Sequence, residues 1–111
     1  MARGLTTTEQ CFLTFMLKRS RCGDGYLDSL AGITVEEADD GGMKGLVFTS
    51  ANEARVLGED IAQIWFNDID GVEVMATLTI DNAGDLYELE VWKVDFSPLL
   101  MLPANPVVIA R

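Results

Sequence analysis

Two glutamates, Glu88 and Glu90, are separated by one residue in a segment that alternates between polar and apolar side chains. Residues two apart on a strand share a face, so these carboxylates would lie together, as the paired carboxylates of glycoside hydrolysis do. Glu73, from the preceding alternating segment, would extend the group. Carboxylates on an exposed strand are far more often a solvated surface, and no pocket signature accompanies them. We therefore rank a carboxylate-only enzyme below a binding surface.

The segment Asp68-x-Asp70-Gly71 resembles part of a calcium loop. In the EF-hand pattern the first ligand would fall at Phe66 and the bidentate glutamate at Thr77, and neither residue can fill that role. Aspartate and glycine are also the ordinary residues of a tight turn. The sequence therefore predicts a turn here and no metal site.

Other catalytic motifs are absent from the sequence. The chain has no histidine, so no Ser-His or Cys-His nucleophile can be built. Gly41, Gly42 and Gly45 lack the Lys-Ser/Thr of a phosphate-binding loop. Cys11 and Cys22 are too few for a disulfide scaffold or a closed zinc site. We expect no enzyme activity and no cofactor, with Cys11 packed in the core and a Cys11–Cys22 redox pair as the alternative.

The charge is strongly acidic. The 111 residues carry 18 Asp and Glu against 8 Lys and Arg, a net charge of −10. Fifteen of the acids and only three bases lie between Glu36 and Asp95, a local net charge of −12. Such a surface repels phosphate backbones and anionic membranes, so we expect neither nucleic acid nor membrane as a partner. It favours a basic protein partner, although acidic turns also serve simply to keep a small protein in solution.

The length corresponds to one domain, residues 1–111, and the composition of 49% apolar and 23% charged residues is typical of a folded chain. The first residues lack the apolar core of a signal peptide. No run reaches the roughly 18 apolar residues of a membrane span. We therefore expect a cytoplasmic protein with reduced thiols.

Helices are expected near the N-terminus. Thr6 and Glu9 match a capping box, and basic residues suit the end of the helix that follows, over 7–19. A second short helix is expected over 26–31, before a glycine stop. The apolar stripe of the first helix consists of Cys11, Phe12, Phe15 and Met16.

Strands are expected further along the chain. Residues 33–37 and 46–49 predict two strands around the turn Asp39-Asp40-Gly41-Gly42. The polar segment 50–58 predicts a loop or a helical turn. Residues 99–102 predict one more strand or a packed arm, which neighbouring prolines restrict to an edge or an irregular segment.

The most regular part of the sequence is 60–95, where apolar and polar residues alternate between turns at 67–71 and 81–85. This pattern predicts three antiparallel strands. The register that keeps both faces consistent has the pairs Ile80–Tyr87, Leu78–Leu89 and Ala76–Val91, and the pairs Phe66–Val72, Ile64–Val74 and Ala62–Ala76. A slip by one residue would bury Glu88 and Glu90 without partners.

The apolar face of these strands would receive the N-terminal helix. We therefore predict an α+β fold with one or two N-terminal helices packed on one face of a mainly antiparallel sheet of four to six strands. The opposite, outer face would consist of Ile61, Gln63, Trp65, Glu73, Met75, Thr77, Thr79, Glu88, Glu90 and Trp92. Aromatic and methionine anchors ringed by charge are typical of protein interfaces, the alternative being that 99–102 or 46–49 covers the tryptophans.

The segment Glu88-Leu89-Glu90-Val91-Trp92-Lys93-Val94-Asp95-Phe96-Ser97-Pro98 is similar to the C-terminal signature of a family of small bacterial domains of uncharacterised function. Leu5-Thr6 with Glu9, and the turn 39–43, fit the same family, so the resemblance covers most of the chain. It implies no catalytic residues. In size, charge and architecture the chain also resembles, more loosely, immunity proteins such as the CdiI type of contact-dependent growth inhibition.

We expect an acidic immunity protein that binds and neutralises a basic toxin, a nuclease above all, because an acidic inhibitor suits a cleft that attracts phosphates. The alternative is a homo-oligomerising or assembly module, a homodimer for instance, that uses the tryptophan face or the arm 99–102. The acidic turn at Asp39 and Asp40 is the alternative inhibitory surface. The expected partner-binding residues are Trp65, Asp68, Asp70, Glu73, Met75, Glu88, Glu90 and Trp92, with the two aspartates at the rim.

Overall fold

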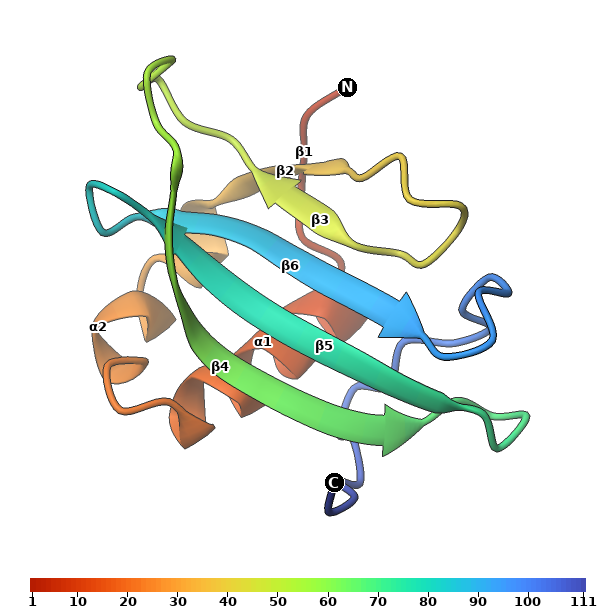
Figure 1. Ribbon diagram of the computed structural model, residues 1–111. Helices are drawn as coiled ribbons and strands as arrows, with labels where there is room; N and C mark the ends of the chain where they lie inside the picture. The colour runs from red at the N-terminus through yellow and green to blue at the C-terminus, as the bar shows by residue number, and fades with distance from the viewer.

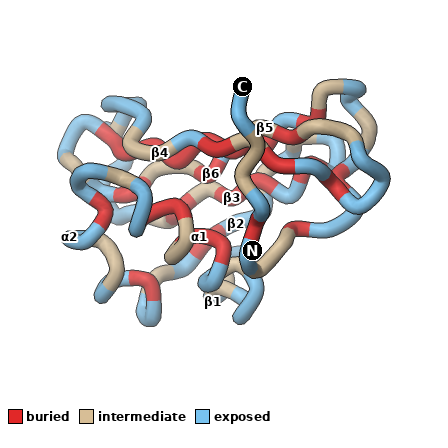
Figure 2. The backbone as a smooth tube through the Cα atoms, turned by 90° about the horizontal axis from the view of Figure 1, so that it is seen from below, coloured by how far each residue is buried: buried red, intermediate tan, exposed pale blue.

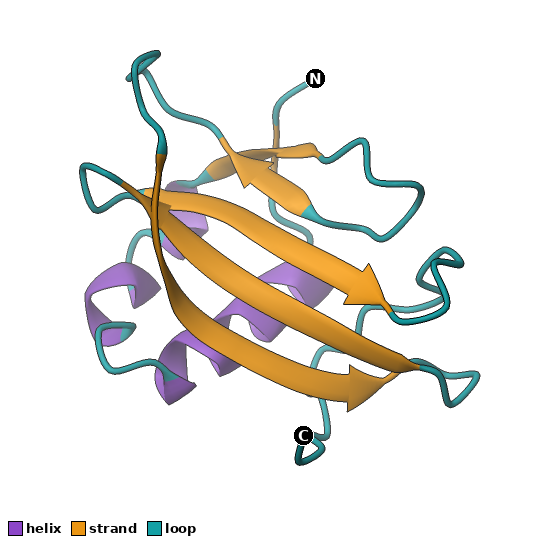
Figure 3. Ribbon diagram, in the orientation of Figure 1, coloured by secondary structure: helices purple, strands orange, loops and turns teal.

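The computed structural model describes all residues, 1–111. Helices cover one face of a six-stranded antiparallel sheet, and the other face has no helix over it (Figures 1 and 3). The predicted α+β class is therefore confirmed. The elements are β1 (Arg3–Gly4), α1 (Thr7–Arg19), α2 (Asp24–Leu27), the 3-10 helix η1 (Leu30–Gly32), β2 (Thr34–Glu37), β3 (Leu46–Phe48), β4 (Leu57–Asn67), β5 (Glu73–Asp81) and β6 (Leu86–Lys93).

Helix α1 begins and ends as predicted, and Thr6 and Glu9 form both hydrogen bonds of the capping box. Its buried stripe is turned by one position from the prediction, to Phe12, Leu13, Met16 and Leu17. Both sets have the same spacing and share Phe12 and Met16, but Leu13 and Leu17 are buried in place of Cys11 and Phe15. The prediction that Cys11 packs in the core is wrong, since Cys11 and Cys22 are both exposed free thiols.

The second predicted helix, 26–31, is divided in the structure. Helix α2 already begins at Asp24, and η1 follows three residues after α2 ends. Gly23, just before α2, lies so close to the end of α1 that an added Cβ would meet the Leu17 carbonyl oxygen at 1.8 Å. Only glycine fits this close approach, and α2 starts two residues before the predicted position.

Strands β2 and β3 form the predicted hairpin, with Val35 opposite Phe48. The segment after β3 is a loop with one turn, in which the Arg55 N–H donates to the Asn52 carbonyl. Strand β4 then begins at Leu57, three residues before the predicted start. The two-residue strand β1 was not predicted, because its apolar pattern is too short to read.

The sheet order is β1-β2-β3-β6-β5-β4. After β3 the chain crosses to the far edge before it returns through β5 to β6, so β6 lies against β3 (Figure 1). Figure 2 shows the helices on one side of the strands, with buried segments in both layers. Twenty apolar residues form this core.

The register of the second hairpin is confirmed at Leu78–Leu89 and Ala76–Val91. Beyond them a bulge in β6 pairs Ile80 with Leu86 in place of Tyr87. Leu86 is accordingly buried, and the predicted inward position of Tyr87 is wrong.

In the first hairpin Phe66 pairs with Val74 and not with Val72, a shift of two residues. The turn has the predicted length but lies one residue later, at 68–72 in place of 67–71, and within it the Asp68 N–H donates to the Val72 carbonyl at 2.9 Å. An even shift leaves every side chain on its face, so the inward position of Phe66 still holds. A bulge between Asp60 and Ala62 does move Ile61, which packs against the core and not on the outer face.

Residues 99–102 form a packed arm and no strand. Leu99 and Leu102 are buried in the core, while Leu100 and Met101 are exposed. The chain then runs on as an irregular tail to Arg111. None of the helices has the length and apolar character needed to cross a membrane.

Candidate functional site: the outer face of the sheet

A row of three side chains crosses the middle of the outer face. Trp65 of β4 pairs with Met75 of β5, which pairs with Trp92 of β6. The two indole rings meet edge to face with centroids 6.1 Å apart, and Phe96 continues the row 5.9 Å beyond Trp92. Trp92 is 37% exposed and Phe96 74% exposed. We call Trp65, Met75, Trp92 and Phe96 the aromatic row.

Neither of the segments proposed as a cover lies over the aromatic row. Strand β3 belongs to the sheet itself, and the arm 99–102 packs into the core on the helix side. Trp92 is thus accessible from the solvent, whereas Trp65 is partly buried. An exposed patch of this kind on a folded chain marks an interaction surface more often than chance exposure does.

Carboxylates flank the aromatic row. Glu90 is exposed and lies opposite Thr77, while Glu73 is half-buried at the turn end of β5. Burial and the neighbouring Glu90 raise the pKa of Glu88 above its ordinary value, although Arg55 counteracts part of this. The predicted carboxylates therefore lie on a surface, and none of them lines any of the four larger cavities.

Two predicted members of the outer face, Thr77 and Thr79, are buried within it. Thr77 accepts a hydrogen bond from the Gln63 side chain at 3.2 Å. The Thr79 hydroxyl exchanges hydrogen bonds with the backbone of Glu88. These two threonines stabilise the bulged strand pair and are not available to a partner.

Asp68 was predicted at the rim of the partner surface, and this prediction is wrong because Asp68 is only 4% exposed. Its carboxylate accepts hydrogen bonds from the Lys93 ammonium at 2.8 Å and from the backbone N–H groups of Leu100 and Met101. Asp70 is partly exposed, yet it also accepts from Lys93, at 2.7 Å. Asp68 is therefore a buried structural residue, whereas Asp70 pairs with Lys93 and keeps 36% of its side chain exposed.

Lys93 is fully buried in the middle of this cluster. Burial alone would lower the pKa of Lys93, but the hydrogen bonds to Asp68 and Asp70 outweigh it and raise that pKa. Burial would likewise raise the pKa of Asp68, and the hydrogen bonds from Leu100 and Lys93 instead hold it below the ordinary range. Both groups are therefore charged at neutral pH, and the cluster ties β6, the turn 68–72 and the arm 99–102 together.

The same stretch of chain sets the direction of the aromatic row. Lys93 points inward, so its neighbour Trp92 points outward. Asp95 accepts hydrogen bonds from both the backbone N–H and the hydroxyl of Ser97, which turns the chain. Phe96 takes a positive φ of 63° in this turn, and its ring lies beside Trp92. The signature segment of the sequence thus builds the outer end of the row.

One contributor to this face has no signal in the sequence. The tail after the arm reaches the β4 edge, where the Ile109 N–H donates to the Trp65 carbonyl at 2.8 Å. The Arg111 guanidinium then lies 4.3 Å from the centre of a Trp65 ring and forms an ion pair with Glu73. Figure 2 shows the C-terminus beyond the sheet, on the side away from α1.

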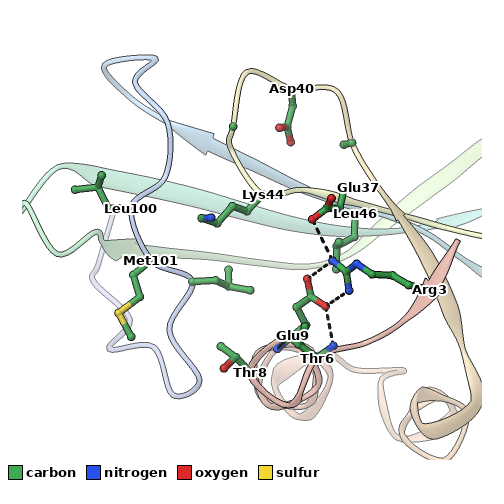
Figure 4. Close-up of a pocket in the computed structure, with 13 residues that line it drawn as sticks. Arg3, Thr6, Thr8, Glu9, Glu37, Asp40, Lys44, Leu46, Leu100 and Met101 are labelled. Carbon is green, nitrogen blue, oxygen red and sulfur yellow. Dashed lines mark hydrogen bonds and ion pairs between the residues drawn. The ribbon is translucent and has the colours of Figure 1, made fainter. Parts of the chain in front are cut away.

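A cavity of about 570 Å³ opens on the other side of the molecule, between the start of α1, the β2–β3 loop and the arm. Figure 4 shows Arg3 paired with Glu9 on one wall, and Met101 on the other. The hydrogen bonds between Arg3 and Glu9 raise the pKa of the arginine and lower that of the glutamate. Asp40 accepts from the backbone of its own loop. The lining therefore carries two positive and three negative side chains, of which Arg3 pairs with Glu9 and Glu37.

Residues 2–103 match the family described as a domain of unknown function (DUF6984), and the chain belongs to that family. The match covers the sheet, the helices and the arm, in agreement with the predicted membership of a family of small domains. No curated protein and no solved structure shows significant similarity to the chain.

Proposed function

We propose that this chain is a binding protein whose outer sheet face captures a basic protein partner. The observation that carries the proposal is the aromatic row, which crosses three strands, exposes Trp92 and Phe96 and has carboxylates at its flanks. Large aromatic side chains and methionine are the residues from which interface hot spots are built. In its finer form, the proposal is that the partner is a basic toxin, above all a nuclease, which this chain neutralises as an immunity protein.

Charge decides the class of partner. Between Glu36 and Asp95 the acids exceed the bases by twelve, and Glu73 and Glu90 each lie two residues along a strand from a member of the row, Met75 and Trp92. Two copies of such a face would oppose like charges, which disfavours a homodimer built face to face. A basic protein would bind this face favourably for two reasons. The negative field steers its approach, and the carboxylates pair with its Lys and Arg side chains.

The edge strand of the sheet also disfavours a homodimer. Strand β4 is interrupted by two bulges at its exposed edge, and the exposed acids Glu59 and Asp60 lie between them. Bulges and charges at an edge strand oppose pairing with a second sheet. The homo-oligomeric alternative therefore has less support from the structure than binding through the outer face.

The experiment is co-purification of the tagged chain with the products of its genomic neighbours, at low and at moderate salt. We expect recovery of one basic protein, with weaker recovery at higher salt. Trp92→Ala should then weaken the complex more than tenfold, since hot-spot truncations cost about 2 kcal/mol or more. Recovery of the chain alone, as a concentration-dependent oligomer in light scattering, would instead establish the homo-oligomeric alternative.

A charge variant separates the outer face from the general acidity of the molecule. Glu90→Lys should slow association with the captured partner and flatten its salt dependence. Glu53→Lys introduces the same charge change at an exposed loop residue outside the face and serves as the matched control. Equal effects of the two variants would mean that this face is not the interface.

A further inference from the structure

We propose that Trp65 and Glu73 form a binding site for an arginine side chain, which the chain's own Arg111 occupies and which an arginine of the partner takes over. This inference rests on the proposed function and names the chemical group that the outer face recognises. The partner is accordingly a protein that presents an arginine on its basic surface.

The contact of Arg111 with this site carries the argument. Its guanidinium lies over Trp65 at 4.3 Å from a ring centroid and also pairs with the Glu73 carboxylate. A cation over an indole face within about 6 Å is attracted by the ring, and tryptophan is the best aromatic for this interaction. One wall of the site is therefore aromatic and the other is a carboxylate, which is the combination that suits a guanidinium.

Arginine fits this combination better than lysine. Its planar guanidinium stacks on the ring while its N–H groups remain free to pair with the carboxylate in the same plane. A lysine ammonium is a point charge that is more strongly hydrated, so it gains less from the indole. The site is thus selective for the side chain and not only for its charge.

The bound Arg111 is easily displaced. The side chains of Arg111 and Glu73 are 41% and 37% exposed, so water reaches both partners of the ion pair. Val107, earlier in the tail, is 80% exposed. The backbone contact of the tail with β4 is the single hydrogen bond from Ile109 to Trp65. Pro106 is buried and Val108 packs against the core, so the part that need move is the end of the tail, exposed Ala110 and Arg111, and its release leaves the sheet intact.

Displacement would also lengthen the accessible row. Met75 pairs with Trp65 in the sheet, and Trp92 and Phe96 follow along the same line. An arginine from the partner at Trp65 would place its neighbouring residues over these side chains. The arginine site is therefore the end of the interface proposed above, and the tail covers this end until the partner binds.

The test uses two blocked pentapeptides, acetyl-Gly-Gly-Arg-Gly-Gly-amide and its lysine counterpart, and follows the indole N–H signals of the full chain by NMR. The Trp65 signal is assigned with Trp92→Phe. In Arg111→Ala we expect the arginine peptide to shift the Trp65 signal and to bind roughly two- to thirtyfold more tightly than to the unchanged chain, the range of a cation–π contact. The lysine peptide should bind more weakly than the arginine peptide.

Arg19→Ala is the matched control, because it removes a cation–π pair of the same kind, with Phe15 at 5.6 Å, from helix α1. It should leave peptide binding unchanged. Glu73→Gln in the Arg111→Ala background should weaken the arginine peptide. If the Trp65 signal of Arg111→Ala does not respond to the arginine peptide, the inference is wrong.

The captured partner separates this inference from the proposed function. Arg111→Ala should strengthen that complex, and substitution of the partner's contacting arginine by lysine should weaken it. A complex that forms through Trp92 but is indifferent to Arg111→Ala would overturn the arginine site and leave the proposed function standing. An arginine peptide that binds at Trp65 while no basic partner is captured would overturn the proposed function and leave the site.

Discussion

Replacement of Asp68 by alanine should destabilise the chain strongly, although the sequence pattern predicts that Asp68 lies in an exposed turn. Its carboxylate accepts four hydrogen bonds: from Lys93 Nζ at 2.8 Å, and from the N–H groups of Ile69, Leu100 and Met101 at 2.8, 2.8 and 3.2 Å. The variant leaves the buried Lys93 ammonium with one carboxylate, from Asp70. Removing one partner of a buried ion pair costs about 3–5 kcal/mol.

That loss is large for a chain of this size, whose free energy of unfolding is on the order of 5–15 kcal/mol. It corresponds to a fall in Tm of roughly 12–30 °C. Urea unfolding followed by tryptophan fluorescence measures it directly, since Trp92 is the residue before Lys93. The urea concentration at the unfolding midpoint should fall, while the slope of the unfolding free energy against urea concentration stays the same.

Asp70→Ala is the control, because it removes the other carboxylate from Lys93 but at a partly exposed position. We expect a loss of about 1 kcal/mol, near the upper end for exposed ion pairs. The double variant Asp68→Ala with Lys93→Met should be more stable than Asp68→Ala alone, since it also removes the stranded ammonium. If Asp68→Ala loses no more stability than Asp70→Ala, the reasoning about the buried cluster is refuted.

The same carboxylate predicts an acid dependence. The pKa of Asp68 is lower in the fold than its ordinary value of 3.8, so its stabilising contribution is complete above pH 3.8 and is lost as the pH falls through the folded value. Asp68→Asn removes this contribution. The difference in unfolding free energy between the unchanged chain and Asp68→Asn should therefore shrink as the pH falls below about 3.8. A difference that stays constant to pH 2 would contradict the low pKa.

Two further predictions concern the helices. Gly23→Ala should lower the free energy of unfolding in urea by about 1–3 kcal/mol, because the added Cβ would meet the backbone of Leu17. Gly25→Ala is the control: its Cβ would meet nothing within 4 Å, so the free energy of unfolding should change by no more than roughly 0.5 kcal/mol. Equal losses would mean that the α1–α2 contact is not close. Cys11 and Cys22 are both exposed, so both thiols should react with a thiol reagent in the native chain without urea. Protection of Cys11 would restore the prediction that it packs in the core.

Local pattern was sufficient for much of the fold. The capping box placed the start of α1 correctly, because its two hydrogen bonds join residues only three apart. The alternation between 60 and 95 predicted three strands, since a strand with one buried face has a period of two. It also predicted that Trp65 and Trp92 share the outer face, which survived the two-residue shift of the first hairpin.

Several features could not be predicted because they depend on contacts between distant segments. The alternation does not show whether a strand contains a bulge, so the displacement of Ile61 and Tyr87 was missed. The pairing of β3 with β6 follows from a crossover whose direction no local motif records. Asp68 was misplaced because the residues that bury its carboxylate lie 25 to 33 positions further along the chain.

The sequence by itself determined the helix cap, the strand periodicity, the acidic field and the composition of the outer face. Each of these depends on neighbouring residues or on a simple count. Only the tertiary structure decided that the arm 99–102 leaves Trp92 exposed, that Lys93 is buried between two aspartates, and that Arg111 lies on Trp65. These three features depend on which distant segments pack against each other. A polar or aromatic side chain stays hydrated or becomes buried according to the segment that packs over it, and that segment can be far away in the sequence.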